Sequence, residues 1–474
     1  MKLALAENQP IATAQAASPA GALAGLSLSM LLSSLGTSIA NVALPTLGPV
    51  FGASFQQVQW IVLAYLLAIT TLIVSVGKLG DMIGRRRLLL AGLALFTAAS
   101  GLCGAAPNLW FLIAARVAQG LGAAIMMALT MALVGETVPK ARTGSAMGLL
   151  GTMSAVGTAL GPALGGTLIG ALGWRAIFLI NLPLGLVAIG LAWRYLPAPA
   201  AKASREPIRL DPLGTLLLAS TLAAYALSMT LGRGHFGPLN LGLLLAAIAG
   251  LGIFVLVEAK VAAPLVRLSM FRDAGLSTGF AINALVMTVP MATLMIGPFY
   301  LSGALGLDAA RVGLVMSAGP VVSALTGVPA GRIVDRFGAA RVTAAGLLGL
   351  IAGATTLASI TPDLGIAGYV ASLVLTTASY ALFQAANNTG VMKDVPQDRR
   401  GVVSGLLNLS RNLGLVTGAS VMGAIFAAAA GAADITGAAP AAVANGLHAT
   451  FAIGALLVAV ALAVFGMGQR RQRR

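Results

Sequence analysis

The sequence is poor in charged residues, cysteine and histidine. Only 9% of its 474 residues are charged, against about 25% in soluble domains. The chain therefore has too few charged residues to form the surface of a water-soluble protein. The single Cys103 excludes an internal disulfide framework and a cysteine metal cluster. The only two histidines, His235 and His448, fall in expected loops or helix ends, so the sequence predicts no metal site.

Signatures of catalysis and of nucleotide use are also missing. The chain has no G-x-x-x-x-G-K-[S/T] phosphate loop, so we expect no direct use of ATP. Two peripheral histidines give no basis for a Ser/His/Asp constellation. The sequence therefore predicts a protein that is not an enzyme and that carries no cofactor.

Long apolar runs make up most of the chain instead. The hydrophobic fraction is 58%, and crossing a bilayer takes about 20 apolar residues. The sequence predicts fourteen transmembrane helices, at residues 22–45, 58–79, 88–106, 109–136, 144–170, 176–196, 212–231, 238–258, 276–303, 311–330, 342–361, 365–391, 402–430 and 446–467.

The basic residues are distributed unequally between the two sides of these helices. Residues 1–20 do not read as a signal peptide, because the polar run at Glu7 precedes any long apolar core. With a cytoplasmic N-terminus, 24 of the 29 Lys and Arg residues lie on the cytoplasmic side and three lie outside. We therefore expect a multi-pass inner-membrane protein with both termini cytoplasmic. The net charge of +16 reflects this topology and not nucleic-acid binding.

A charged segment occurs twice. Residues 77–87 (GKLGDMIGRRR) return 254 residues later at 331–341 (GRIVDRFGAAR), each between apolar runs. Two copies in register indicate a duplicated membrane unit. Eight predicted helices separate the two copies of the segment. Two six-helix halves with nothing between them would place only six helices there. We expect an all-α protein of two pseudo-symmetric six-helix bundles plus two extra helices. The expected parts are a cytoplasmic tail (1–20), the N-terminal bundle (21–197), a linker that contains helices 7 and 8 (198–262), the C-terminal bundle (263–468) and a basic cytoplasmic tail (469–474).

These segments resemble the loop motif of the major facilitator superfamily, specifically its fourteen-helix drug:proton antiporters. The resemblance implies a gate that closes the cytoplasmic side. We expect Asp81 to face the positive N-terminus of a helix in the other half, for example the one starting near Arg341. The alternative is a charged turn that only sets topology. The gate-motif residues are Gly77, Gly80, Asp81, Gly84, Arg85, Arg86, Asp335 and Arg336.

Two further stretches carry the resemblance. Residues 116–124 (RVAQGLGAA) resemble the family's helix-4 motif, which implies that Arg116 takes part in proton coupling or substrate-coupled charge exchange. The alternative is a structural arginine bonded to backbone carbonyls. Residues 157–166 resemble the helix-5 antiporter motif, which marks exporters. Its glycines recur every four residues, which gives a flat ridge for another helix, and its proline permits a bend. The motif comprises Gly157, Gly161, Pro162, Gly165 and Gly166.

Helix 1 departs from the family pattern. Residues 35–45 (LGTSIANVALP) resemble L-D-x-T-[I/V]-x-N-V-A-L-P, but Gly36 stands at the position of the family's Asp. None of the thirteen acids lies in the middle of a predicted helix, and Glu136 comes nearest, at the inner end of helix 4. Either Glu136 or Asp81 carries protons near the inner mouth, or coupling is unusual, or it is absent.

Polar side chains in predicted helices are candidates to line a cavity. Lipid cannot satisfy their hydrogen bonds, so we expect them to point into the bundle. They either contact substrate or only join helices to one another. The candidates are Asn41, Asn283, Gln384, Asn387, Asn388, Arg411 and Asn412.

Together these patterns predict a secondary transporter that works by alternating access. The resemblance implies export of hydrophobic or amphipathic small molecules in exchange for protons, as in multidrug resistance. The alternative is an exporter or facilitator of a neutral or anionic metabolite, without the usual helix-1 acid. The expected partners are a small-molecule substrate, protons and the lipid bilayer, with no nucleic acid and no nucleotide.

If Glu136 carries the proton, Glu136→Gln should abolish proton-coupled transport and leave expression intact, because the amide cannot release a proton. The measurement is transport activity per amount of protein in the membrane. Unchanged activity would exclude Glu136 as the carrier.

Overall fold

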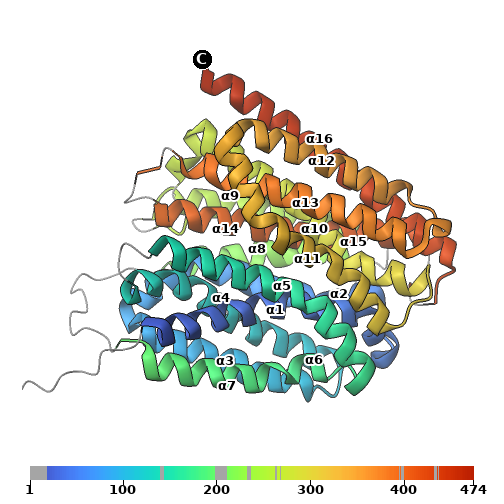
Figure 1. Ribbon diagram of the computed structural model, residues 1–474, viewed down its shortest axis with the longest axis horizontal. Helices are drawn as coiled ribbons and strands as arrows, with labels where there is room; N and C mark the ends of the chain where they lie inside the picture. The colour runs from blue at the N-terminus through green and yellow to red at the C-terminus, as the bar shows by residue number, and fades with distance from the viewer. Residues whose placement is uncertain are drawn as a thin grey trace, which may run out of the picture.

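The computed structural model describes residues 19–473 except 139–142, 198–210, 232–235, 262–263, 267, 394, 397–399, 432–434 and 436. Within this part of the chain, fourteen helical segments are long and apolar enough to cross a membrane, which confirms the predicted number. They run nearly parallel in one bundle (Figure 1). The predicted tail 1–20, except its last two residues, and most of the polar linker before residue 211 lie outside the described residues.

The first half of the bundle has six spans. They are α1 (Pro19–Phe51), α2 (Phe55–Ile83), α3 (Arg85–Gly104), α4 (Leu109–Thr137), α5 (Thr143–Leu172) and the pair α6 (Ala176–Leu179) and α7 (Asn181–Tyr195). Two extra helices follow, α8 (Pro212–Thr230) and α9 (Pro238–Glu258).

The second half repeats the pattern. It contains η2 (Leu268–Arg272), α10 (Ala274–Gly303), α11 (Ala309–Phe337), α12 (Ala339–Ser359), η3 (Pro362–Leu364), α13 (Gly365–Met392), α14 (Arg400–Thr417), η4 (Gly418–Met422), α15 (Gly423–Ala430) and α16 (Pro440–Arg473). Helices α14 and α15 form one span, and η4 between them is a turn of π-helix. Each half lies on its own side of the molecule, the first below and the second above in Figure 1.

The duplication is visible at one turn in each half. Gly84 ends α2 and precedes α3, with φ 98°, and Gly338 ends α11 and precedes α12, with φ 83°. Both backbones occupy a region that side chains rarely adopt, so glycine is required there. These turns lie at the end that the charge distribution predicts to be cytoplasmic, which we call the inner end. The opposite end is the outer end.

Helix α5 packs against both halves through glycine. A Cβ at Gly161 would lie 2.7 Å from Cβ of Ser38 on α1, and one at Gly157 would lie 2.4 Å from the Leu31 carbonyl oxygen. On another face, near the outer end, a Cβ at Gly166 would lie 2.7 Å from Cα of Gly313 on α11. The absence of side chains therefore permits helix contact within the first half and between the halves.

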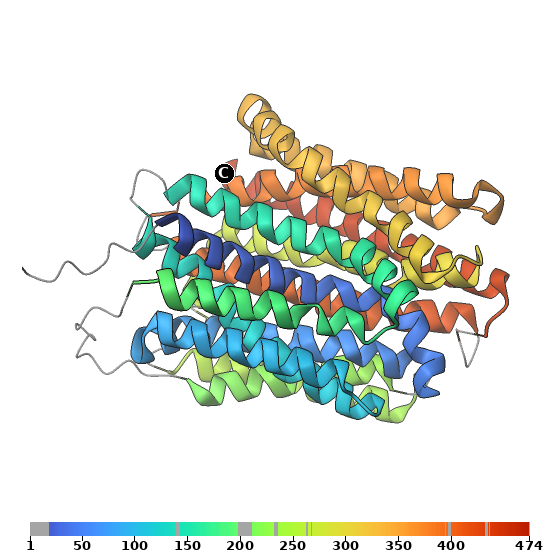
Figure 2. The ribbon, with the colours of Figure 1, turned by 60° about the horizontal axis from the view of Figure 1, so that its bottom comes forward.

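The halves separate toward the inner end. Figure 2 shows α5 and α11 close together at the right and diverging toward the left. A Cβ added at Gly148 or Gly151 of α5, or at Gly327 or Gly331 of α11, would meet nothing within 4 Å. Helices α5 and α11 thus touch at Gly166 and Gly313, while these glycine positions nearer the inner end are not covered by a neighbouring helix.

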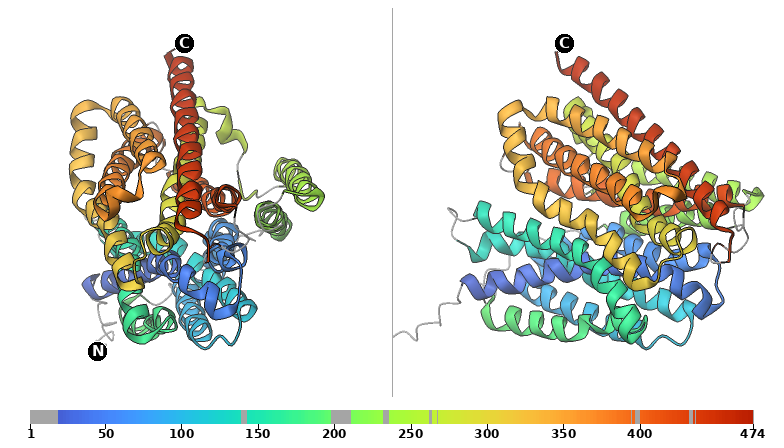
Figure 3. Two further views of the ribbon diagram at one scale, coloured as in Figure 1. Left: turned by 90° about the vertical axis from the view of Figure 1, so that its right-hand side faces the viewer. Right: turned by 45° about the vertical axis from the view of Figure 1, so that its right-hand side comes forward.

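The extra helices α8 and α9 stand at the edge of the bundle (Figure 3). Helix α8 spans the boundary between the halves. Trp60 of α2 donates from Nε1 to Oγ1 of Thr230 at 3.1 Å, and Tyr225 donates to Oγ1 of Thr417 on α14 at 3.2 Å. Helix α9 packs on α8 and is mostly exposed, with large apolar side chains such as Ile248 facing outward as a lipid-facing helix requires.

We expect Gly166→Ala to destabilise this arrangement by about 1–3 kcal/mol, because the new methyl group would overlap the backbone of α11. The matched control is Gly170→Ala on the same helix, whose Cβ would meet Cβ of Ala310 at an ordinary 3.5 Å. The measurement is the melting temperature of the purified protein. Equal melting temperatures for the two variants would contradict the assigned contact.

Candidate transport site

Arg116 of α4 is fully buried and bonded on several sides. Its Nε donates to the Ile61 carbonyl oxygen at 2.9 Å, one terminal nitrogen donates to the Gly36 carbonyl oxygen at 3.0 Å, and the other donates to Oε1 of Gln119. The guanidinium carbon lies 4.1 Å from the centre of the Tyr65 ring. In this conformation the charge is stabilised by carbonyl dipoles and an aromatic face.

This network connects four helices of the first half. Gln119 donates from Nε2 to Oγ of Ser100 on α3 at 2.7 Å, and the Tyr65 hydroxyl donates to the Ser33 carbonyl oxygen on α1 at 2.7 Å. The sequence motif identified Arg116, but Ser33 and Ser100 carry no signal that distinguishes them from other serines. The contacts match a structural arginine in this conformation, the alternative weighed above.

The departure at Gly36 has a structural counterpart. A Cβ at this position would lie 2.9 Å from the Tyr65 hydroxyl and 3.3 Å from the Phe96 ring. The Gly36 carbonyl oxygen already accepts from Arg116. The position at which the family has an acid is therefore next to the guanidinium, and here the backbone of α1 supplies the acceptor.

The predicted proton carriers lie at helix ends. Asp81 is two residues before the last residue of α2, and Glu136 is next to the last residue of α4. Their side chains are outside the described part of the chain. Among the described residues, no group of three His, Cys, Asp or Glu side chains could hold a metal ion.

The first gate motif contacts its surroundings through basic residues. Lys78 donates from Nζ to the Pro264 carbonyl oxygen at 3.2 Å, and Arg86 donates to the Trp193 carbonyl oxygen. In the second copy, Asp335 and Arg336 are exposed.

One second-half helix packs along α2. It is α14, which runs antiparallel to α2. Spacing alone could not reveal this pairing because it depends on how the halves dock. The side chain of Asp81 is outside the described part of the chain, so its expected partner, the helix that starts near Arg341, stays a prediction.

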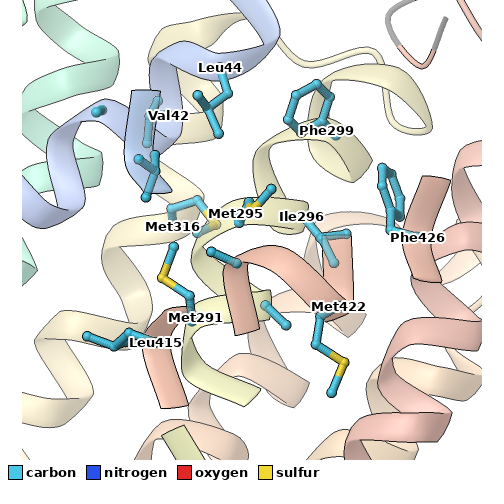
Figure 4. Close-up of a cluster of buried hydrophobic side chains, with 14 of the residues drawn as sticks. Val42, Leu44, Met291, Met295, Ile296, Phe299, Met316, Leu415, Met422 and Phe426 are labelled. Carbon is cyan, nitrogen blue, oxygen red and sulfur yellow. The ribbon is translucent and has the colours of Figure 1, made fainter. Parts of the chain in front are cut away.

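Apolar side chains from both halves close the outer end. The Phe55 ring of α2 lies 4.9 Å from that of Phe299 and 5.4 Å from that of Phe426. Figure 4 shows Phe299 and Phe426 in one cluster with Met295 and Met422. The packing contains few directed bonds, and methionine adapts to neighbours of different shape.

One polar contact crosses this cluster. Gln59 of α2 donates from Nε2 to the Ala419 carbonyl oxygen in η4. Both residues are fully buried. A π-helical turn leaves a carbonyl without its usual helical partner, and such turns are frequent at functional sites. The sequence analysis missed Gln59 and η4, because neither lies in a recognised motif.

The polar candidates of the second half divide by what they contact. Asn283 donates to the Leu407 carbonyl oxygen and to Oγ of Ser410, both at 3.1 Å, and so joins α10 to α14. Asn387 donates to the Gly279 carbonyl oxygen at 3.3 Å and joins α13 to α10.

The remaining candidates have different environments. Asn41 is buried and donates to its own helix, while its Oδ1 has no partner. Arg411 is half-buried with an unbonded Nε, and Asn412 is buried with an unbonded Nδ2. Gln384 is half-buried and Asn388 is exposed. In this conformation the unbonded atoms of Asn41, Arg411 and Asn412 are enclosed by protein.

Two pockets flank the helices of the second half. One of about 260 Å³ lies at the outer end between α1, α10 and α11, and its lining includes Thr46, Phe299 and Ser302. One of about 80 Å³ lies at the inner end, between α10, α12, α13 and α16, and Asn387 lines it.

The sequence model of the Major Facilitator Superfamily matches residues 26–419 and, in a second match, 290–473. The chain belongs to the Major Facilitator Superfamily. This confirms the family predicted from the motifs, and the fourteen spans agree with its fourteen-helix branch. The fold likewise confirms two bundles of six spans plus two extra helices.

Named relatives span most of the chain. It is 30% identical over 400 residues to the riboflavin transporter RibZ of Clostridioides difficile, covering 84% of this chain and 86% of that protein. It is 32% identical over 415 residues to the multidrug resistance protein Stp of Mycobacterium tuberculosis, covering 85% of this chain and 75% of that protein. The chain also resembles the solved structure of a bacterial homologue of the human lysosomal transporter Spinster in an inward-facing and occupied conformation. The TM-score is 0.70 at 17% identity, and the match covers 94% of this chain and 96% of that chain.

We expect Arg116→Lys to impair transport and to lower stability by about 1–3 kcal/mol, because one ammonium group cannot reach the three acceptors that the guanidinium fork reaches. The measurements are transport rate and melting temperature. Arg175→Lys, at an exposed position at the outer end, is the control. Wild-type behaviour of the Arg116→Lys variant would show that the fork geometry is dispensable.

Proposed function

We propose that this protein is a secondary active exporter of hydrophobic or amphipathic small molecules, coupled to protons and working by alternating access. The observation that carries the proposal is the unequal contact between the halves. They meet at the outer end through Gly166 and Gly313 and through the cluster around Phe55. In the inner parts of α5 and α11, a Cβ added at the glycines named above would have no atom of the other half within 4 Å. Closing the inner end and opening the outer end would deliver a substrate outward.

The residues between the halves favour an apolar substrate. Met291, Met295 and Met422 come from α10 and η4, and Phe299 and Phe426 add aromatic faces (Figure 4). Flexible thioethers and rings accommodate ligands of different shape. The similarity to a multidrug resistance protein supports the same substrate class.

A second candidate is export or facilitated movement of a neutral or anionic metabolite. Arg116 and Arg411 lie within spans, and no described acid lies in the middle of one. Such a charge distribution disfavours a permanent cation. The similarity to a riboflavin transporter points in the same direction.

Coupling and orientation complete the proposal. Glu136 and Asp81 are the proposed proton carriers, since both lie at the inner ends of helices in the first half. Arg116 would hold α1, α2 and α4 together while the halves move. The proposed location is the inner membrane, with both termini cytoplasmic, because the described basic residues at helix ends gather at the inner end.

The deciding experiment uses inside-out vesicles from overexpressing cells, energised to be acid inside. We expect addition of a transported hydrophobic compound to release protons, which a pH-sensitive dye reports. Vesicles with the Glu136→Gln variant serve as the matched control. Movement of a labelled compound down its gradient without proton release would support the facilitator and overturn proton coupling.

A further inference from the structure

Two carboxyl groups are buried together at the inner end of the extra helices. Asp211 precedes the first turn of α8 and caps it, and Glu258 is the last residue of α9. Their exposed fractions are 6% and 3%. Acidic side chains are almost never this buried unless they are paired, and neither belongs to a motif of the transport site.

Each carboxyl group uses one oxygen to hold the backbone. Oδ1 of Asp211 accepts from the Gly214 amide at 2.7 Å, and Oε2 of Glu258 accepts from the Val266 amide at 3.0 Å. The remaining oxygens, Oδ2 and Oε1, are buried and have no donor.

These two remaining oxygens face the same point. A Cβ built on Gly214 would lie 2.4 Å from Oδ2 of Asp211 and 2.6 Å from Oε1 of Glu258. Both oxygens therefore border the same small volume beside Gly214. Two ionised carboxylates in this position would repel, and each would lack a partner for a buried charge.

Among the described residues, no basic side chain is bonded to Oδ2 of Asp211 or to Oε1 of Glu258. Lys78 of α2 donates to the Pro264 carbonyl oxygen, and Lys260, beyond α9, is exposed. Asp273, at the start of α10, accepts from the amides of its own first turn.

We propose that Asp211 and Glu258 form a proton-binding site in which the two carboxyl groups share one proton. The protonated group donates to the ionised one, so both unpartnered oxygens become satisfied. Loss of the proton leaves two facing carboxylates and pushes the start of α8 away from the end of α9.

The site is connected to the first gate motif through α2. Oγ1 of Thr215 donates to the Asp211 carbonyl oxygen at 2.8 Å and lies 2.9 Å from Oγ of Ser75. Lys78, in the gate motif, bonds to Pro264, two residues before Val266. Cytoplasmic pH would therefore act on the inner end of α2 through these contacts. The carboxyl pair would bind its proton whichever substrate moves, and whether or not transport is coupled to protons.

The first test is infrared spectroscopy of the purified full chain at neutral pH. Exposed acids are ionised there, so we expect a carboxylic-acid C=O band that disappears on alkalinisation and is absent from Glu258→Gln and from Asp211→Asn. Asn caps a helix as well as Asp does, so Asp211→Asn keeps the start of α8. No such band in the wild type, or a band that persists in both variants, would overturn the proposal.

The second test is the melting temperature as a function of pH. The shared proton removes the repulsion between the two facing carboxyl groups, so its stabilising effect is present at low pH and lost as pH rises until both groups are ionised. We expect the wild type to lose stability toward alkaline pH and both variants to show a flatter profile, because an amide donates to the remaining carboxylate at any pH.

The control is Asp308→Asn, which alters the exposed cap of α11 that bonds to Arg311. We expect this variant to keep the wild-type profile and the infrared band. A rise in wild-type melting temperature with Na⁺ or Ca²⁺ that Glu258→Gln abolishes would identify a metal-cation site and contradict the shared proton. Neither measurement involves transport, so failure here is distinguishable from failure of the export proposal.

Discussion

Helices in a membrane approach closely only where their side chains are small, and this structure depends on α5 meeting that condition on two faces. Gly157 and Gly161 bring α1 against it inside the first half, and Gly166 brings α11 against it across the boundary. The face shared with α1 holds the two helices of the first half together. The crossing with α11 lies toward the outer end and leaves the inner parts of α5 and α11 apart.

The cost of burying charge determines where ionisable groups occur. Arg116 is surrounded by acceptors that cannot titrate, and its hydrogen bonds join three helices. The acids of the described chain lie instead at helix ends, where backbone amides receive them, as at Asp273 and Asp308. Asp211 and Glu258 are the pair in which burial and mutual repulsion act together.

The sequence predicted the fold well because lipid imposes simple rules. Span length gave fourteen helices, and the repeated loop gave the junctions at Gly84 and Gly338. Motif spacing found Arg116 and the glycine row, but not the acceptors of Arg116, which are backbone carbonyls and therefore present at every residue. It did not predict that α2 packs along α14, because docking of the halves depends on shape over many residues. The roles of Asp81 and Glu136 stay predictions.

The π-helical turn at η4 has a consequence for how this protein can diverge. One side of the polar contact at the outer end is the Ala419 carbonyl oxygen, a main-chain atom, and the other is the Gln59 side chain. Side-chain replacements in η4 leave the acceptor in place as long as the turn persists. Two kinds of change would therefore remove this contact: replacement of Gln59, or deletion of one residue that returns the span to regular α-helix.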